Sequence, residues 1–384
     1  MNNFDDIRFY SDAEVPEIMK RMLDNEQFVN LLGMLVPQIP NDILKQQLLA
    51  VKSIDEFQKH FMYPFLKDLE AKKTNGVDFF GIETIDRDKP YLYISNHRDI
   101  TIDSVFLCLS MLKNEMKTVG IAIGDNLLIY PWIENFVRIN QAFIVRRGQK
   151  SLHQVLEDSQ TLSAYIRKLI KDDQRSIWIA QREGRSKDSN DRTQEALLKM
   201  LAYGGEKDFF ENFSELNICP LAISYEYDPT DYLKAKEFQL KRDNPEYKKQ
   251  PKDDLENMQV GITGFRGKVD YRISGDINAE VREIAEKTSV RKERINLLAK
   301  AVDKKIYSNY TIFNVNKIAY DLLKNEKRFA HDYTDVERSD FENYVSKQIA
   351  KIEITDKDLN FLRIKMLEMY ANPLINQLGE SIFN

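Results

Sequence analysis

The sequence predicts an α/β protein, with a mixed sheet covered by helices on both faces, an N-terminal helical bundle and C-terminal helices. Glycine usage is the first observation behind this prediction. Of 14 glycines, one precedes residue 76 and one follows residue 275, and turn-rich α/β segments need glycine more than helices do. Between these positions, short β-rich runs alternate with helical periodicity. We therefore expect three units, at residues 1–76, 77–275 and 276–384.

The N-terminal unit is predicted to be a small helical bundle. Its apolar residues recur at helical spacing, and Pro37 and Pro40 separate two helices. A third helix is expected over residues 53–73, with a kink or break at Pro64 because proline lacks the N–H that a helix interior uses.

No run of 18 uninterrupted apolar residues occurs, and the acidic first residues lack the order of a secretory signal. We expect a cytoplasmic chain with at most a peripheral membrane contact.

Strands of the central unit are expected at short, nearly continuous apolar runs, the pattern of a sheet that is covered on both faces. The runs are residues 91–94, 118–123, 142–145, 176–180, 220–224, 258–263 and 268–273. Helices are expected at residues 152–171 and 192–203, and an exposed loop or helix pair at residues 234–254. Residues 261–268 imitate a phosphate loop with the wrong spacing, so we expect a hairpin between the last two strands.

Composition excludes several classes of function. The 56 Lys+Arg against 61 Asp+Glu leave a formal charge of −5, which argues against a general nucleic-acid binder. Cys108 and Cys219 are too few for a disulfide framework and have no metal-ligand spacing. Such a chain fits a reducing compartment.

His97 is the one of the four histidines that follows an expected strand at its carboxyl end, where open α/β sheets bind their ligands. A helix is expected to begin near Asp99, with this residue as its N-cap. Asp103 would lie one turn later and could direct its carboxylate back at His97. Such a pair fixes the tautomer of an imidazole that acts as a general base. The alternative is that His97 only caps the helix. The sequence has no Gly-x-Ser-x-Gly elbow, so a serine acyl-enzyme is not expected.

Two further expected strands also end in charged residues. These residues are Arg146, Arg147, Glu183, Arg185 and Lys187, with Gly184 among them. Arginine side chains at strand ends are suited to binding a phosphate through two hydrogen bonds. A surface ion pair would explain any one of them, but three charged strand ends in one sheet favour a shared pocket for an anionic ligand.

Four blocks between residues 88 and 225 resemble the motifs of the glycerolipid acyltransferases, a family that includes glycerol-3-phosphate and 1-acylglycerol-3-phosphate (lysophosphatidic acid) acyltransferases. The family pattern is Asn-His-x4-Asp, then Phe-x-x-Arg, then Pro-Glu-Gly-Thr-Arg-Ser, then an apolar segment with proline. The corresponding residues here are Asn96-His97 with Asp103, Phe143 to Arg146, Glu183 to Ser186, and Ile218 to Leu221.

The chain departs from this pattern in two places. Five residues rather than four separate His97 from Asp103, which leaves Asp99 as an alternative partner of the histidine. In the third block Ala180-Gln181-Arg182 precedes Glu183, and Arg185 directly follows Gly184 without a threonine.

The resemblance implies transfer of an acyl group from a thioester, on acyl-carrier protein or acyl-coenzyme A, to a hydroxyl of a glycerol phosphate or lysophospholipid. It implies that no metal or redox cofactor is needed. The implied roles are His97 as base, Asp103 or Asp99 as its orienting partner, Arg146 and Arg185 as phosphate ligands, Glu183 and Gly184 as shaping the acceptor site, and Arg147, Arg98 and Lys187 as additions. The helical N-terminus is similar to that of the soluble glycerol-3-phosphate acyltransferases. A catalytically silent lipid- or acyl-carrier-binding protein that keeps the fold is the alternative.

Overall fold

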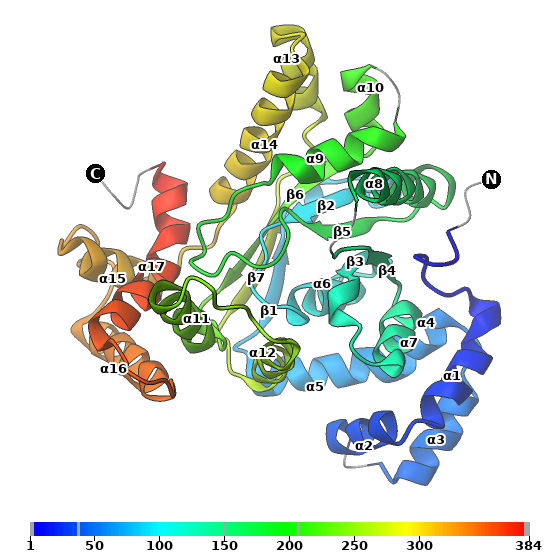
Figure 1. Ribbon diagram of the computed structural model, residues 1–384, viewed down its shortest axis with the longest axis horizontal. Helices are drawn as coiled ribbons and strands as arrows, with labels where there is room; N and C mark the ends of the chain where they lie inside the picture. Colours follow the sequence, from blue (N-terminus) through cyan, green and yellow to red (C-terminus); the bar gives the residue numbers. More distant parts are fainter. Residues whose placement is uncertain (1–3, 37–38, 149–150, 206–207, 380–384) are drawn as a thin grey trace.

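A seven-stranded mixed sheet forms the centre of the molecule, with strand order β1-β7-β6-β2-β5-β3-β4 (Figure 1). The computed structural model describes residues 4–36, 39–148, 151–205 and 208–379. The strands are β1 (Val77–Phe80), β2 (Leu92–Ser95), β3 (Gly120–Gly124), β4 (Ala142–Val145), β5 (Ile177–Ala180), β6 (Ile218–Tyr225) and β7 (Val269–Ile273). Strands β6, β2, β5, β3 and β4 are parallel, whereas β7 is antiparallel to β6 and parallel to β1. The loops that follow the five parallel strands therefore emerge at one edge.

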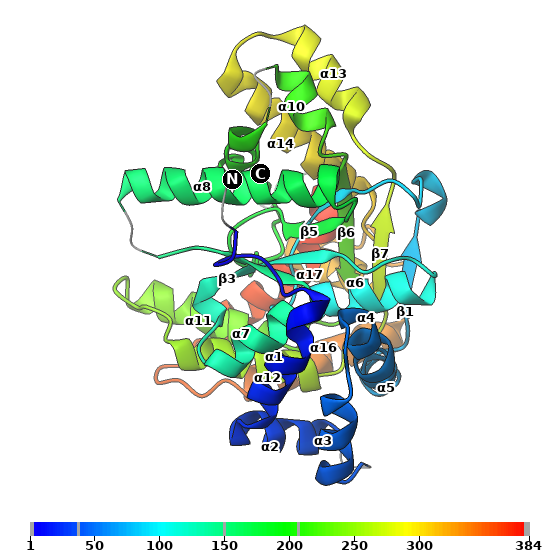
Figure 2. The same ribbon diagram turned by 90° about the vertical axis from the view of Figure 1, so that its right-hand side faces the viewer.

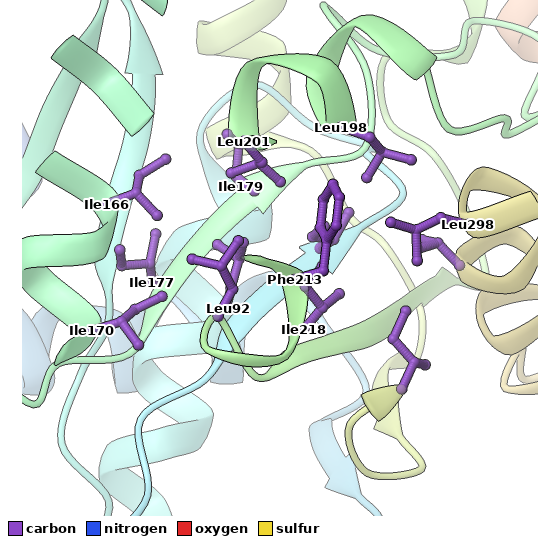
Figure 3. Close-up of a cluster of buried hydrophobic side chains, with 14 of the residues drawn as sticks. Leu92, Ile166, Ile170, Ile177, Ile179, Leu198, Leu201, Phe213, Ile218 and Leu298 are labelled. Carbon is purple, nitrogen blue, oxygen red and sulfur yellow. The ribbon is translucent and has the colours of Figure 1, made fainter. Parts of the chain in front are cut away.

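Helices cover both faces of this sheet, as the sequence predicts. On one face lie α8 (Leu152–Arg167), α9 (Glu195–Leu201), α10 (Phe209–Ser214), α13 (Asn278–Lys287) and α14 (Arg291–Ser308). Figure 3 shows this core, where Leu198 and Leu298 of the helices lie near Ile218 of the sheet. On the other face, α5 (Tyr63–Lys73) and α6 (Ile102–Lys113) bury their apolar residues against the strands. The predicted fold class is confirmed.

The N-terminal helices form a cluster of their own. They are α1 (Val15–Leu23), α2 (Glu26–Leu35), α3 (Asn41–Leu49) and α4 (Ile54–Phe57), and they pack on α7 (Pro131–Ile139). Pro40 directly precedes α3, whereas Pro37 lies outside the described residues. The third predicted helix continues past Pro64, since a π-helical turn at Gln58–Met62 links α4 to α5. The missing N–H of Pro64 thus coincides with a change of hydrogen-bond pattern rather than a break.

Two predictions for residues 234–268 are wrong. Residues 258–263 are the end of helix α12 (Pro251–Thr263) and not a strand, so no hairpin precedes β7. Leu255, Met258 and Ile262 have helical spacing, but the run of residues 258–263 is too short for its periodicity to tell a helix from a strand. Residues 234–254 do contain a helix pair, α11 (Asp231–Asp243) and the start of α12, but α11 buries one face and is not an exposed insertion.

The helices after residue 276 fall into two groups. Helices α13 and α14 belong to the core on the sheet, whereas α15 (Asn314–Lys324), α16 (Asp335–Ala350) and α17 (Leu359–Leu378) share a separate core with α11. Figure 2, a view turned by 90°, shows α13 and α14 at the opposite end of the molecule from α2 and α3. The unit boundaries at residues 76 and 275 stay predictions. Within the described ranges, no helix is both long and apolar enough to cross a membrane.

Candidate active site

Asn96 fixes the point where the chain leaves β2, directly before His97. Its side chain is buried and bonds to both backbone groups of Ile223 in β6: Asn96 Nδ2 donates to the carbonyl oxygen at 2.9 Å, and the Ile223 N–H donates to Asn96 Oδ1 at 2.8 Å. Backbone pairing between β2 and β6 extends to Ser95. The Asn96 side chain therefore continues the ladder beyond the strand, and His97 emerges at the carboxyl edge of the sheet.

His97 lies against Asp103. The distance from His97 Nδ1 to Asp103 Oδ2 is 2.7 Å; the side chain of Asp103 is fully buried and that of His97 is 13% exposed. The ring of Trp178 in β5 meets the imidazole edge-on, with 5.7 Å between ring centroids, and Trp178 Nε1 donates to Ser95 Oγ. Because Asp103 occupies the Nδ1 side, Nε2 is the ring nitrogen that can exchange a proton with a bound hydroxyl.

The Asp103 carboxylate accepts three further hydrogen bonds. Oδ2 accepts from the backbone N–H groups of Arg98 at 2.6 Å and Asp99 at 3.1 Å, and Oδ1 accepts from the Tyr225 hydroxyl at 2.7 Å. Burial by itself raises the pKa of Asp103, but the hydrogen bonds from His97, Tyr225 and Arg98 outweigh it and hold this pKa below its ordinary value. An ionised Asp103 can only accept, so it holds His97 in the tautomer with a proton on Nδ1.

Asp99 has a different role from Asp103. Its Oδ1 accepts from the N–H groups of Thr101 and Ile102, both at 2.9 Å, and its Oδ2 lies 3.2 Å from Nη2 of the fully buried Arg266. Helix α6 begins at Ile102, later than predicted, and Asp99 binds its first N–H groups from the preceding turn. The aspartate that contacts His97 is therefore Asp103, while the orienting role of either aspartate stays a prediction.

Arg98 is turned into the protein. Its Nη2 lies 2.8 Å from Oδ2 of the buried Asp191, which also accepts from the Tyr310 hydroxyl at 2.6 Å. The ion pair ties the residue after His97 to α9 and α14, because Asp191 precedes α9 and Tyr310 follows α14. Arg98, an addition to the phosphate ligands in the sequence prediction, thus has an internal partner.

The cations expected to share one pocket lie in separate ion pairs. Arg146 Nη2 lies 2.8 Å from Asp6 Oδ2, and Arg146 Nη1 lies 3.4 Å from Asp158 Oδ1. Lys187 instead forms an ion pair with Glu237 of α11. Each of these two cations therefore neutralises carboxylates of its own surroundings, and the shared pocket stays a prediction.

Arg147 and Arg185 are bound more loosely. Arg147 Nη1 lies 3.7 Å from Glu183 Oε1, which joins the loops after β4 and β5, and Arg185 Nη2 donates to Asn257 Oδ1 at 3.1 Å. Gly184 has φ of +67°, a left-handed conformation that favours glycine at this turn. The carboxylate contact of Arg147 is thus long, and the side chain to which Arg185 donates is a neutral amide.

Sequence reasoning missed the residues that hold the loop of residues 97–103, the proposed catalytic loop, from distant parts of the chain. Tyr225, Arg266 and Lys234 all contact residues 98–103, yet they lie more than a hundred positions further along the chain. Nothing in their local sequence signals these contacts.

Among the described residues, no group of three or more His, Cys, Asp or Glu side chains is placed to hold a metal ion.

Residues 76–224 match the family model described as Acyltransferase. This segment, which covers less than half of the chain, is similar to an acyltransferase domain and is named the acyltransferase domain after that model. It runs from β1 into β6 and contains His97, Asp103 and the charged loops after β4 and β5. The match confirms the resemblance that the four sequence blocks predict.

One solved structure to which the chain is similar is the 1-acyl-sn-glycerophosphate (LPA) acyltransferase PlsC from Thermotoga maritima. The two are 14% identical, with a TM-score of 0.37, over 77% of this chain and 92% of that chain. No curated protein sequence matches the chain. So distant a similarity fixes neither the substrate nor the chemistry of this chain.

Proposed function

We propose that the acyltransferase domain moves a fatty acyl group from an acyl thioester to a hydroxyl of a glycerol phosphate or lysophospholipid, with His97 as general base. The observation that carries this proposal is the contact between His97 and the buried Asp103 at the carboxyl edge of the sheet, inside the segment that matches the Acyltransferase model. The donor would be acyl-carrier protein or acyl-coenzyme A.

In the proposed reaction, the hydroxyl oxygen of the acceptor attacks the thioester carbonyl carbon while Nε2 of His97 takes the hydroxyl proton. Asp103 keeps the other ring nitrogen protonated and stabilises the imidazolium that forms. The C–S bond then breaks, and the leaving thiolate takes the proton from His97. The products are an ester and a free thiol. The step needs no metal or redox cofactor, because the thioester already carries a good leaving group.

Arg147 and Arg185 are the proposed ligands of the acceptor phosphate, with Glu183 and Gly184 shaping the site between them. Their weak contacts leave guanidinium N–H groups for an incoming phosphate. Arg146 and Lys187 stay candidates from the sequence, but a phosphate would have to displace the carboxylates that they bind.

A screen of donors and acceptors by lipid mass spectrometry tests this function. Acyl-coenzyme A and acyl-carrier protein are each combined with glycerol 3-phosphate, lysophospholipids and aminoacyl lipids. We expect a new ester and free thiol with the wild type and a loss of about 100-fold or more in His97→Ala. His153→Ala, at an exposed position, is the matched control.

Two outcomes would count against the proposal. Equal thioester consumption by His97→Ala and the wild type would exclude the general base. Binding of acyl-carrier protein or lipid without any turnover would favour the non-catalytic binding protein instead. Within the enzyme, Arg185→Ala should raise KM for a phosphate-bearing acceptor, and an unchanged KM would remove its assigned role.

A further inference from the structure

Lys234 of α11 reaches the catalytic loop. Its side chain is 1% exposed, and Nζ donates to the backbone carbonyl of Arg98 at 2.8 Å while it forms an ion pair with Asp228. The N–H of Arg98 donates to Asp103. Both backbone polar groups of the residue that follows His97 are therefore held, one by Asp103 and the other by Lys234.

Stability alone does not explain this buried pair. Burial lowers the pKa of Lys234 despite the neighbouring Asp228, whereas the ammonium group keeps the pKa of the Asp228 carboxyl below its ordinary value. Removing two charges from water costs about as much as their attraction returns, so an apolar pair of similar volume is often as stable. What an apolar pair could not supply is a donor at the Arg98 carbonyl.

The C-terminal helices hold the same residues from the other side. The Asp228 N–H donates to the Tyr370 hydroxyl of α17 at 3.0 Å, and this hydroxyl donates to Asp231 at 2.8 Å. Tyr344 of α16 donates to the same carboxylate oxygen at 2.7 Å. Figure 1 shows α11 between these helices and the sheet. A continuous chain of contacts thus runs from α16 and α17 through α11 to the residue after His97.

We propose that Lys234 is a positioning residue for His97, anchored by the C-terminal helices. Its ammonium group fixes the Arg98 peptide, and this peptide shares Asp103 Oδ2 with the imidazole, so a shift at Arg98 changes the contact between His97 and Asp103. The inference rests on the proposed function for the role of His97, but its structural part can be measured without turnover. It assigns to helices outside the acyltransferase domain an influence on its catalytic loop.

The test is the double variant Lys234→Met/Asp228→Asn. It removes both charges together, so no uncompensated buried charge remains, and the introduced asparagine keeps an Oδ1 acceptor for the two hydrogen bonds from Thr230. The Arg98 carbonyl loses its donor, and the amide Nδ2 of the introduced asparagine takes the place of the oxygen that accepted from Lys234.

A matched control is Lys113→Met/Glu70→Gln. Lys113 likewise bridges a carboxylate and a backbone carbonyl, with Nζ 2.8 Å from Glu70 Oε1 and 3.0 Å from the Val77 carbonyl oxygen, but it serves β1 and not the catalytic loop. The Lys113 side chain is 34% exposed and that of Lys234 is 1% exposed, so the unfolding free energy of each double variant is measured beside kcat to separate a loss of stability from a loss of positioning.

We expect kcat of the Lys234 double variant to fall about 10- to 100-fold while KM for the acceptor stays within about threefold. The ring ¹⁵N signals of His97 should change from one tautomer, protonated on Nδ1, to a mixture, while the other three histidines serve as internal references. The control should show neither change.

Wild-type-like kcat and ring signals in a folded double variant would overturn the positioning role. If the wild type shows no turnover, the proposed function is rejected, and the ring signals alone test the positioning. A changed tautomer in the double variant would then still support the positioning role of Lys234. Should the double variant fail to fold, Tyr370→Phe removes the hydroxyl that holds Asp228, and it should produce a smaller change of the same kind. Unchanged ring signals in that variant would likewise overturn the inference.

Discussion

Asp103→Asn is the sharpest perturbation of the candidate site, because it keeps the size of the side chain and removes only its charge. The carboxylate takes three donors at Oδ2, from His97, Arg98 and Asp99, and one at Oδ1, from Tyr225. An amide has one acceptor oxygen. It can satisfy the Oδ2 side only by turning its NH₂ group toward Tyr225, whose hydroxyl must then accept.

The structure sets the size of two effects. Four hydrogen bonds to a charged acceptor become hydrogen bonds to or from a neutral amide, which costs roughly 1 kcal/mol each. The variant also no longer buries a charge, which offsets part of this loss. The net decrease in unfolding free energy should be about 2 kcal/mol. The larger effect is on the reaction. His97 would form its imidazolium without a neighbouring anion, which in comparable histidine–aspartate pairs lowers kcat by about 10³–10⁴-fold, or roughly 4–5 kcal/mol.

The assay is steady-state thioester consumption near pH 7.5, with Asp99→Asn as the matched control. Asparagine at position 99 keeps the Oδ1 acceptor for Thr101 and Ile102 but loses the ion pair with Arg266, so this variant should be less stable yet retain kcat within about tenfold. If Asp103→Asn keeps more than about a tenth of the wild-type kcat, the reasoning is refuted. If the control loses more activity, Asp99 is the partner that matters.

Acid unfolding gives a second readout for Asp103. Its pKa in the folded protein lies below the ordinary value, so its contribution to stability is present above the unfolded pKa of about 4 and is lost as pH falls through the folded value. The wild type should therefore lose more unfolding free energy than Asp103→Asn between about pH 5 and pH 2. Parallel losses would show that the carboxylate is not stabilised in the folded state.

Three further substitutions test the surroundings of the site. In Gly261→Ala the new Cβ would lie 2.4 Å from Asp99 Oδ2, so unfolding free energy should fall by about 1–3 kcal/mol in urea titrations; an unchanged midpoint would contradict this contact. Tyr225→Phe removes a donor to Asp103 and should lower unfolding free energy by about 1–2 kcal/mol and also lower kcat, whereas unchanged kcat would separate the hydroxyl from catalysis. Burial, aided by Asp228, raises the pKa of Asp231 to about 7, so its stabilising protonated form is lost as pH rises through 7. In the unfolded chain this carboxyl ionises at about pH 4, so the wild-type Tm should fall relative to that of Asp231→Asn between about pH 4 and pH 7; parallel curves would contradict the shift.

Sequence reasoning predicted the parts of the site that depend on local order. Buried parallel strands have continuous apolar runs, so β2, β4 and β5 could be located, and the position of His97 at the end of β2 followed. The contact between His97 and Asp103 was also predicted, although α6 begins at Ile102 and not near Asp99. The catalytic roles of both residues stay predictions.

The parts that escaped prediction depend on contacts between distant segments. Asn96 binds Ile223, Asp99 binds Arg266, and Lys234 binds the Arg98 carbonyl, and no local periodicity encodes such pairs. The ion pairs of the predicted phosphate ligands escaped prediction for a related reason, and the shared pocket itself stays a prediction. Arginine and lysine at strand ends are as suited to nearby carboxylates as to a phosphate, and only the folded chain brings Asp6 to Arg146 or Glu237 to Lys187.

The turn between His97 and Asp103 has one residue more than the family pattern. Residues beyond the acyltransferase domain hold this turn in place. Because α6 begins at Ile102, four of the five residues between His97 and Asp103 lie in the turn before the helix, and the N–H groups of Arg98 and Asp99 in this turn donate to Asp103 Oδ2. A longer turn has more freedom to lose. It is held by Arg266 at Asp99 and by Lys234 at Arg98, and both cations lie beyond residue 224, where the match to the Acyltransferase model ends. The segment that departs from the family spacing is thus fixed by residues outside the matched domain, which explains how the altered spacing can still bring Asp103 to His97.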